Sequence, residues 1–454
     1  MSLKIKIKKG IDIRLKGVAE KLYANVPKSK FYSIDPSDFI GITPKLAVKE
    51  KDVVLSGDVV FFDKKNPNIK FTSPVSGSVT QINRGAKRKI LSIIIESNLK
   101  INYKKFKKYK FDELDRNIIV KQLLESGLWP SIRQRPFAII ANPNDIPKSI
   151  HISTFDTSPL ACDNNFIIHG MNREFQNGIN IIKKLTDGIV HLNIISNSDC
   201  SDVFKTTSGV QINQFSGPHP SGNIGTQIHH IDPINKGEVI WYLYTQDIIA
   251  ISKLFENGIY DASKLIALGG SQVKNPRYYR LLRGASIENI ISDNIIFNKS
   301  NSENRYISGN VLTGKKIDSK GYLGYYHNEI CVIPEGNNTE FLGWLLPGLS
   351  KFSLSRTFYS WLNMKKKYTI SANMNGEERA YVVTGQYEKI FPMDIYPQQL
   401  IKATIFNDIE LMEKLGIYEV AEEDFALCEF SCTSKIPIQK IIRDGLNKIQ
   451  KEFT

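Results

Sequence analysis

The 454-residue sequence has no apolar stretch that approaches the roughly 20 residues a helix needs to cross a bilayer. Its N-terminus, MSLKIKIKKGIDI, carries charges but no apolar core of the kind that marks a secretory signal peptide. These two absences predict a cytoplasmic protein with no membrane span of its own.

Cysteine is scarce, and the five cysteines lie far apart, at positions 162, 200, 331, 428 and 432. This scatter in a large chain predicts reduced thiols rather than disulfides. An iron–sulfur cluster usually needs four cysteine thiolates, whereas the C-terminal run LCEFSC offers only Cys428 and Cys432, at a different spacing. We therefore expect these two side chains to be small buried hydrophobes.

Recognisable catalytic motifs are also missing. The sequence contains no GxSxG nucleophile elbow, no P-loop GxxxxGK[ST], no HExxH zinc motif and no convincing Cys/His pair. We expect no catalytic residue and no metal ligand on this chain. The pattern is that of an enzyme fold whose site residues have been lost.

The charge balance is basic, with a formal net charge of +14. The lysines are spread along the chain, as a general coding bias towards Lys, Ile and Asn would produce, and no RNA-binding signature or helix-turn-helix pattern accompanies them. We expect no nucleic-acid partner. The basic charge can still attract a membrane surface or a protein partner.

The fold class indicated by the whole sequence is α/β and multidomain. Residues 1–103 read as short strands punctuated by Gly and Pro, typical of a barrel-sandwich hybrid domain of the lipoyl and biotinyl type. Two runs carry this interpretation, Val53–Phe62 and Lys70–Arg88. The hairpin between them holds Lys64 and Lys65, but Lys65-Asn66-Pro67 enlarges the turn that a modifying ligase would read, so we expect an unmodified domain.

Three further domains follow. In residues 112–258 strands and helices alternate, which predicts a Rossmann-like, doubly wound parallel sheet. Its first helix is expected to end at Pro130, the next at Gly188 and the last at Gly258. Residues 262–312 fit a small β-grasp unit. Residues 313–454 are expected to be rich in strands through about residue 381 and then helical.

A glycine-rich loop, FSGPHPSGNIGT, lies inside the α/β domain. Its glycines could cradle a phosphate or a flavin, yet the run is not GxGxxG, and its prolines remove backbone donors. The loop and the helix after it also carry three histidines, whose spacing matches no common zinc pattern, so we expect them to be satisfied by ordinary hydrogen bonds. The glycines are Gly217, Gly222 and Gly225, and the histidines are His219, His229 and His230.

These segments together resemble the A subunits of the sodium-translocating NADH:quinone reductases (the NqrA family), which belong to bacterial respiratory pumps of six subunits. The resemblance covers nearly the whole length. Its most specific segments are FFDKKNPNIKFTSPVSGSVTQINRGAKR, LLESGLWPSIRQRPF, FSGPHPSGNIGT, GGSQVKNPR, RGASIENI, GYLGYYH and ALCEFSC.

The resemblance implies a peripheral location on the cytoplasmic face of the bacterial inner membrane, beside the membrane-embedded B subunit of the complex and its other subunits. It implies that the β-grasp unit is of the SLBB type. The family is similar in architecture to the flavin subunit of complex I and to the C subunit of the Rnf complex, which hold flavin, NADH and iron–sulfur clusters. Here the glycine loop is degenerate and the cysteine run incomplete. The resemblance therefore implies no cofactor on this chain, whose role would be assembly and support of quinone reduction coupled to Na+ export.

Two alternatives remain open. The chain could bind ubiquinone at a site of its own, because a quinone needs an apolar slot with one or two donors and the aromatic-rich segments supply both. The residues that could contact such a ligand are His219, Tyr322, Tyr325, His327, Arg356 and Phe358. The other alternative, a carrier or nucleic-acid-binding protein, rests only on the basic charge and the N-terminal domain.

Overall fold

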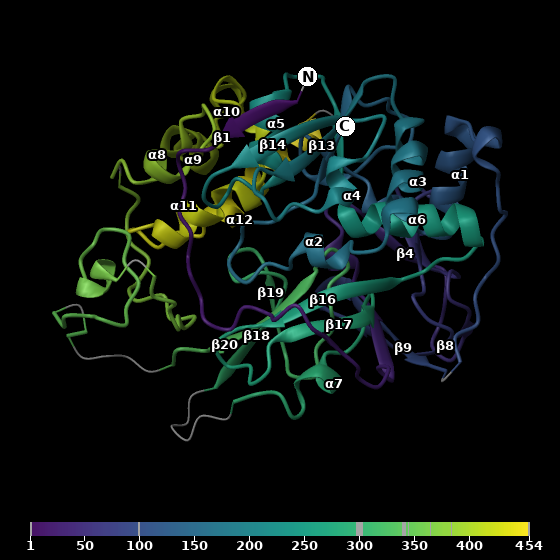
Figure 1. The fold of residues 1–454 in the computed structure, drawn as a ribbon, viewed down its shortest axis with the longest axis horizontal. Helices are drawn as coiled ribbons and strands as arrows, with labels where there is room; N and C mark the ends of the chain where they lie inside the picture. The colour runs from purple at the N-terminus through teal and green to yellow at the C-terminus, as the bar shows by residue number, and fades with distance from the viewer. Residues whose placement is uncertain are drawn as a thin grey trace.

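The computed structural model describes residues 2–98, 100–296, 303–337, 342–343, 345–363, 365–382 and 384–452. Its strands form four sheets of seven, six, four and three strands. Figure 1 shows the strands of the α/β domain with the C-terminal helices beside them, the six-stranded sheet below, and the N-terminal β-domain at one side. Within these described ranges, every helix is too short or too polar to cross a membrane.

The N-terminal domain consists of two antiparallel sheets that share one core. One sheet has the order β3-β9-β8-β5 and the other the order β4-β6-β7. Phe61 and Phe71 of the second sheet stack at 4.4 Å, and Phe39 packs against both rings. The strands are β3 (Phe31–Ile34), β4 (Pro44–Leu46), β5 (Val53–Val54), β6 (Val59–Asp63), β7 (Lys70–Thr72), β8 (Gly77–Arg84) and β9 (Ile90–Ser97).

The α/β domain is built on the seven-stranded sheet, with the order β1-β14-β13-β12-β15-β10-β11. Strands β14, β13, β12 and β15 are parallel, and β10 adds to β15 in the antiparallel direction. The strands are β1 (Leu3–Lys6), β10 (Arg133–Arg135), β11 (Ile139–Ile140), β12 (Ser149–Ser153), β13 (Ile189–Ile195), β14 (Gln211–Ser216) and β15 (Ile240–Tyr244). This order is the doubly wound arrangement that the sequence predicts.

The helices of this domain end where glycine or local hydrogen bonds stop them. Helix α6 ends at Gly258 in the left-handed conformation, as predicted, but α1 ends at Gly127 rather than at Pro130, and α3 ends before the expected Gly188. A left-handed glycine satisfies the last carbonyls and closes a helix earlier than a following proline would. The helices are α1 (Arg116–Ser126), α2 (Asn164–Ile167), α3 (Asn172–Lys183), α4 (Asp202–Lys205), α5 (Ile224–Ile231) and α6 (Thr245–Asn257).

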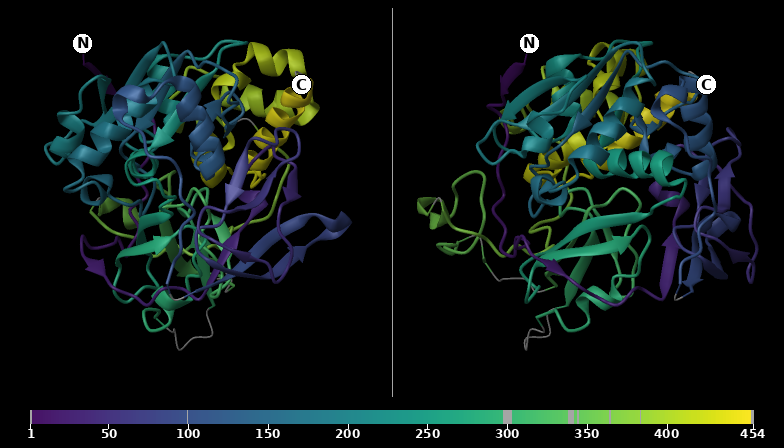
Figure 2. Two further views of the ribbon diagram at one scale, coloured as in Figure 1. Left: turned by 90° about the vertical axis from the view of Figure 1, so that its right-hand side faces the viewer. Right: turned by 45° about the vertical axis from the view of Figure 1, so that its right-hand side comes forward.

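The first strand differs from the sequence expectation. The pattern predicts one β-domain over residues 1–103, but β1 pairs in parallel with β14, with Ile5 opposite Phe215. The chain then leaves the α/β sheet and runs the length of the molecule before it enters the N-terminal domain (Figures 1 and 2). Along this path β2 (Tyr23–Ala24) joins the six-stranded sheet beside β17. Alternation alone does not specify which sheet a strand joins.

The six-stranded sheet forms around the predicted β-grasp unit, with the order β19-β18-β20-β16-β17-β2. Its elements are β16 (Ser263–Gly269), β17 (Arg277–Leu282), α7 (Glu288–Ile291), β18 (Asn304–Ser308), β19 (Lys315–Ile317) and β20 (Glu329–Pro334). The prediction of strands through about residue 381 holds for β19 and β20 but is wrong beyond them, because among the described residues no strand follows Pro334.

The C-terminal part is helical, as the sequence predicts. Its helices pack on one another around Leu400, Met412, Ile442 and Leu446, all fully buried. The helices are α8 (Tyr387–Ile390), α9 (Pro397–Phe406), α10 (Ile409–Lys414), α11 (Ala426–Ser431) and α12 (Ile438–Glu452), with a 3₁₀ turn, η7 (Glu422–Phe425), before α11.

Candidate functional site: the carboxyl end of the parallel sheet

Ligands of doubly wound sheets bind outside the carboxyl ends of the strands, where the strand order reverses. Here the order reverses between β12 and β15, and the glycine loop leaves the carboxyl end of β14 and leads into α5. This is where a dinucleotide-binding fold would place a phosphate, at the N-terminus of a helix.

The loop uses its backbone donors on its own chain. The His219 N–H donates to Asp12 Oδ1 at 3.0 Å, and the Gly222 N–H donates to Thr157 Oγ1 at 3.0 Å. The Ser221 and Asn223 N–H groups donate to carbonyls within the loop. A phosphate would have to break these bonds before the same donors could hold it.

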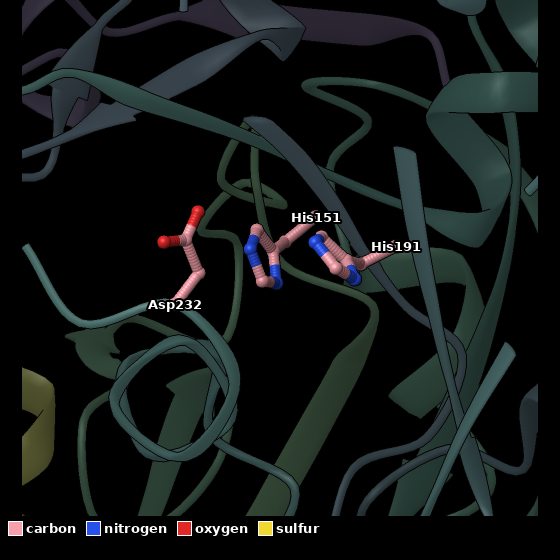
Figure 3. Close-up of side chains that lie close together, drawn as sticks. All are labelled: His151, His191 and Asp232. Carbon is pink, nitrogen blue, oxygen red and sulfur yellow. The ribbon is translucent and has the colours of Figure 1, made fainter. Parts of the chain in front are cut away.

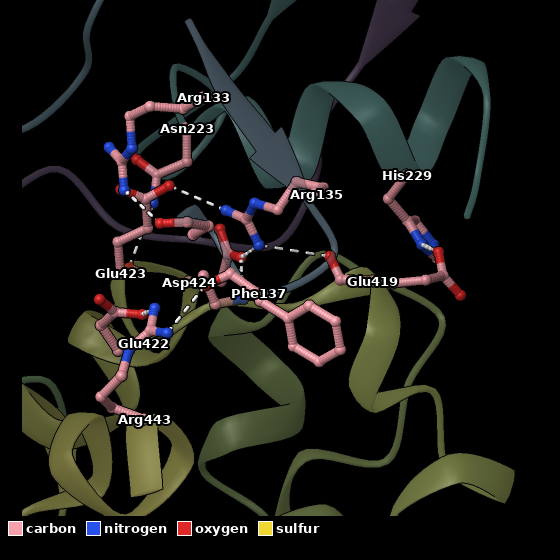
Figure 4. A network of polar contacts seen from close by, with 12 residues as sticks. Arg133, Arg135, Phe137, Asn223, His229, Glu419, Glu422, Glu423, Asp424 and Arg443 are labelled. Atoms are coloured by element: carbon pink, nitrogen blue, oxygen red, sulfur yellow. Dashed lines mark hydrogen bonds and ion pairs between the residues drawn. The ribbon is translucent and has the colours of Figure 1, made fainter. Parts of the chain in front are cut away.

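The N-terminus of α5 is covered by a carboxylate from the C-terminal part of the chain. A Cβ placed on Gly225 would lie 2.4 and 2.5 Å from the two carboxylate oxygens of Asp424, so the absence of a side chain there admits this carboxylate. Arg135, on β10, donates to Asp424 Oδ2 at 3.0 Å and to Glu423 Oε1 at 2.8 Å. Figure 4 shows the Glu423 and Asp424 side chains beside Arg135. Asp424 thus packs closely against the first turn of α5 at Gly225.

The Asp424–Arg135 pair is deeply buried. Arg135 is fully buried and Asp424 is 3% exposed. Burial raises the pKa of Asp424, against the opposing effect of Arg135. Further contacts extend the junction, since His229 Nδ1 lies 2.7 Å from Glu419 Oε2 and the Asn223 amide donates to the Glu423 carbonyl. The C-terminal part is therefore fastened to the α/β domain by polar contacts at this edge.

The two faces of the seven-stranded sheet differ in chemistry. One face presents apolar side chains to α3 and α6, including Ile152, Leu192 and Trp241. Side chains alternate between faces along a strand, so their neighbours in sequence lie on the other face, beneath α5. The positions paired across the strands of that second face include Tyr242, His151, His191 and Gln211.

An amide network fills much of this polar face. Asn213 Nδ2 donates to Asn193 Oδ1 at 3.0 Å, and Asn193 Nδ2 donates to Gln227 Oε1 of α5 at 3.0 Å. Gln227 Nε2 then donates to Ser153 Oγ at 3.0 Å. The four side chains come from three strands and one helix, and each is buried. The network therefore adds hydrogen bonds to the apolar contacts by which α5 packs on the sheet.

Two histidines and one aspartate gather on the same face (Figure 3). His151 and His191 are direct partners on β12 and β13, and their rings stack with centroids 4.5 Å apart. Asp232, which follows α5, lies beside them, and one ligand atom from each of the three lies within 4.8 Å of the others. These residues could hold a metal ion. The signal that would have found them is a histidine at the same position of two adjacent parallel strands.

The histidines that the sequence singled out do not form a cluster. His219 Nδ1 lies 3.1 Å from Thr157 Oγ1, and His230 Nε2 lies 3.1 Å from the Pro392 carbonyl. With His229 bound to Glu419, each of the three has a hydrogen-bond partner. This agrees with the expectation of satisfied histidines.

The six candidate ligand residues lie in three separate places. Tyr322, Tyr325 and His327 share one loop of the six-stranded domain, where Ser308 Oγ lies 2.8 Å from His327 Nδ1. The other three lie outside this loop. His219 contacts Asp12 and Thr157 in the α/β domain, Arg356 lies over Trp361, and Phe358 lies beneath Lys351.

Of these six residues, Tyr325 lines a small hollow where three domains meet. The hollow is bordered by aromatic rings and by a buried ion pair, since Arg283 lies 4.3 Å from the Tyr325 ring centroid and 2.6 Å from Asp247 Oδ1. Burial raises the pKa of Asp38, which accepts a hydrogen bond from the Tyr325 N–H, to about 6. The other lining residues include Phe39, Phe71, Thr72, Gly127, Tyr260 and Leu323.

The lysine and cysteine positions agree with the sequence analysis. Lys64 and Lys65 lie in the wide turn between β6 and β7, where Asp63 Oδ1 accepts from the Lys65 N–H. All five cysteines are free and buried, and Cys428 and Cys432 pack in the helical core. The prediction that Cys428 and Cys432 are small buried hydrophobes is confirmed.

Comparison with known families matches three consecutive parts of the chain. Residues 5–98 match the NqrA N-terminal barrel-sandwich hybrid domain, residues 114–260 the NqrA second alpha/beta domain, and residues 265–319 the NQRA C-terminal domain. The A subunit of the Na(+)-translocating NADH-quinone reductase of Photorhabdus laumondii is 37% identical over 99% of this chain and 100% of its own length. The chain belongs to this NqrA family.

Other members of the NqrA family show the same relation. The A subunits of the reductases of Pasteurella multocida and Histophilus somni are 37% and 38% identical, each over 99% of this chain and 100% of their own length. The family match confirms the predicted fold class and the resemblance on which it rested. A solved structure of an NAD+-reducing nickel–iron hydrogenase aligns with 78% of this chain and 67% of its own length, at 11% identity. Its TM-score of 0.38 is too low to support an inference.

Proposed function

We propose that this chain is the peripheral A subunit of a Na+-translocating NADH:quinone reductase, on the cytoplasmic face of the inner membrane, and that it holds no flavin, NADH or iron–sulfur cluster. In this proposal it supports assembly of the complex and the quinone-reduction step coupled to Na+ export. The membrane-embedded B subunit of the complex and its other subunits are the partners.

The observation that carries the proposal is the Asp424 carboxylate over Gly225. A dinucleotide at this helix N-terminus would bring its phosphate against a buried carboxylate that Arg135 already neutralises. Two negative groups in one poorly solvated position repel strongly. The intramolecular carboxylate therefore competes with any phosphate ligand.

A second observation supports a role inside a complex. Exposed large apolar side chains gather between positions 342 and 382, a segment with little regular structure. They are Leu342, Leu345, Leu346, Leu349, Tyr359, Trp361, Leu362, Met374 and Val382. A concentration of this kind is typical of a surface that another molecule covers.

The first experiment is reconstitution of the six-subunit complex with and without this chain. We expect Na+-coupled quinone reduction to be lost without it and to return when purified chain is added back. Full Na+-coupled activity of the remaining five subunits would contradict the proposed role.

Equilibrium dialysis of the isolated chain against NADH and against a flavin tests the absence of cofactors. We expect no saturable binding up to about 100 μM ligand, the range of weak specific affinities. Saturable binding that the Gly225→Val variant abolishes would show that the helix N-terminus is a working nucleotide site and would refute this part of the proposal.

The quinone alternative is favoured only at the hollow beside Tyr325, which combines aromatic walls with the Arg283 donor. His219, Arg356 and Phe358 lie elsewhere, so they cannot act together with Tyr325 in one site. Titration of the isolated chain with a soluble ubiquinone analogue, comparing wild type with Tyr325→Leu, decides it. Saturable binding that the variant loses would favour this alternative, and its absence would reject it.

A further inference from the structure

We propose that His151, His191 and Asp232 form a binding site for one divalent transition-metal ion, for which zinc is the best fit. The site would be structural and would hold α5 against the sheet. It is separate from the redox cofactors considered above and does not depend on the proposed function.

The donor set suits such an ion. Imidazole nitrogens and a carboxylate oxygen are the ligands that zinc shares with its neighbours in the first transition row, whereas calcium and magnesium prefer oxygen alone. Two of the three ligands are imidazoles. One ligand atom from each residue already lies within 4.8 Å of the others. The two rings are stacked, so binding would also require the imidazoles to rotate until both lone pairs face the ion.

One ligand atom has no other use in the structure. Within the described chain, His151 Nε2 is buried and has no hydrogen-bond partner. A fully buried nitrogen without a partner inside a cluster of other ligands is rare, because an unsatisfied buried polar atom destabilises the fold. A bound metal ion would satisfy it.

The surroundings supply the second set of contacts that metal sites usually have. His151 Nδ1 lies 3.5 Å from the Asn193 amide, and His191 Nδ1 lies 3.2 Å from the Asn213 amide. Side chains that contact the far nitrogen of a ligating histidine orient its ring toward the ion. Turning one amide alone would break the Asn213–Asn193–Gln227 network, so these amides would have to turn together. Their oxygens would then face the Nδ1–H groups, which leaves the Nε2 lone pairs for the metal.

The present partners of Asp232 also leave it available to a metal ion. His151 and His191 lie side by side beneath α5, and the remaining ligand, Asp232, is held by side chains that can exchange partners. Asp232 now accepts from Ser149 Oγ at 2.7 Å and pairs with Lys148 Nζ at 2.7 Å. Lys148 is exposed and also pairs with Glu238, so it can release Asp232 to a metal ion while keeping one carboxylate partner.

The test uses the full chain, stripped with a chelator, reloaded with zinc chloride and desalted. We expect one retained zinc ion per chain and a rise in the unfolding temperature on reloading. Cobalt(II) in place of zinc should give the visible absorption of a four- or five-coordinate site with nitrogen ligands.

Variants locate the site. Asp232→Asn and His151→Gln should each weaken zinc binding by at least about 10-fold, as loss of a ligand or of its orientation does. His169→Gln, which changes an exposed histidine just after α2, is the matched control and should retain the ion. Asp232 is only partly buried, so Asp232→Asn remains informative if His151→Gln does not fold. No retained zinc, or equal retention by wild type and both variants, would overturn the proposal.

Discussion

The two faces of the seven-stranded sheet are held by different forces. The face toward α3 and α6 is a continuous apolar layer, while the face toward α5 carries a network of amides, hydroxyls, imidazoles and the Arg135–Asp424 ion pair. Apolar packing is tolerant of small changes in shape, whereas a buried polar network depends on every partner. The apolar face therefore supplies much of the stability, and the polar face specifies how α5 and the C-terminal part dock.

The largest effect is expected from breaking the buried ion pair. Arg135→Met leaves Asp424 buried without its partner, which should lower the free energy of unfolding by about 3–5 kcal/mol. Urea denaturation of the purified chain measures this change. Lys236→Met removes the exposed Lys236–Glu413 pair and should cost no more than about 1 kcal/mol. A similar loss of unfolding free energy in the two variants would show that the Arg135–Asp424 pair is not the main contact that stabilises this face.

On the apolar face, truncation of one side chain should cost nearly as much. Leu192→Ala removes a fully buried side chain next to α3 and α6, for which about 2–5 kcal/mol is expected from lost burial and the cavity left behind. Leu192→Met, which roughly preserves volume, should cost less than about 1.5 kcal/mol. Urea midpoints of both variants check the contrast, and an equal loss would indicate that shape rather than burial dominates here.

A single amide on the polar face should have a smaller effect. Asn193→Ala leaves Gln227 and Asn213 each short of one partner, which should destabilise the chain by about 1–3 kcal/mol. Hydrogen exchange should show faster opening of α5 in this variant. Asn257→Ala, at the exposed end of α6, is the control and should stay within about 0.5 kcal/mol of wild type. Unchanged exchange in α5 would argue against the network as its anchor.

The smallest expected effect is on the pH dependence of stability, which the two buried histidines of the polar face should cause. Burial lowers the pKa of His151 and of His191 in the folded chain below the unfolded value of about 6.5. Their contribution to stability is therefore complete above that value and is lost as the pH falls below it, because the unfolded chain takes up the protons first. With a chelator present, the His151→Gln/His191→Gln double variant should lose less stability than wild type between about pH 7 and about pH 5. Leu192→Ala should keep the wild-type dependence of the free energy of unfolding on pH. The same dependence in wild type and both variants would show that the two histidines do not cause it.

Local patterns predict most elements of the fold but not their neighbours. The Gly258 terminus of α6, the C-terminal helices and the β-grasp strands follow from periodicity and glycine placement. The pairing of β1 with β14 does not, because a short alternating strand fits the edge of any sheet. Aromatic and β-branched residues after Pro334 favour strands locally, yet β propensity acts only where a partner strand is within reach.

In the candidate site, too, local patterns predict some features, while others depend on contacts between distant segments. The prolines and the missing GxGxxG pattern indicate a degenerate loop from the sequence alone. The carboxylate that covers the end of α5 could not be foreseen, because Asp424 and Gly225 come from distant segments with no local signal that joins them. Sequence reasoning likewise misses His151 and His191, since each stands alone in an apolar run and only strand pairing brings them together.

The sequence by itself determined the fold class, the family and the absence of recognisable catalytic and cluster-binding motifs, because these depend on residue types at fixed local spacings. Tertiary structure decided which polar groups meet. The Asp424 carboxylate at the N-terminus of α5, the polar face beneath that helix and the His151–His191–Asp232 cluster all arise from contacts between distant segments. Such contacts form when packing brings buried polar groups within hydrogen-bonding distance, and no short stretch of sequence encodes that distance.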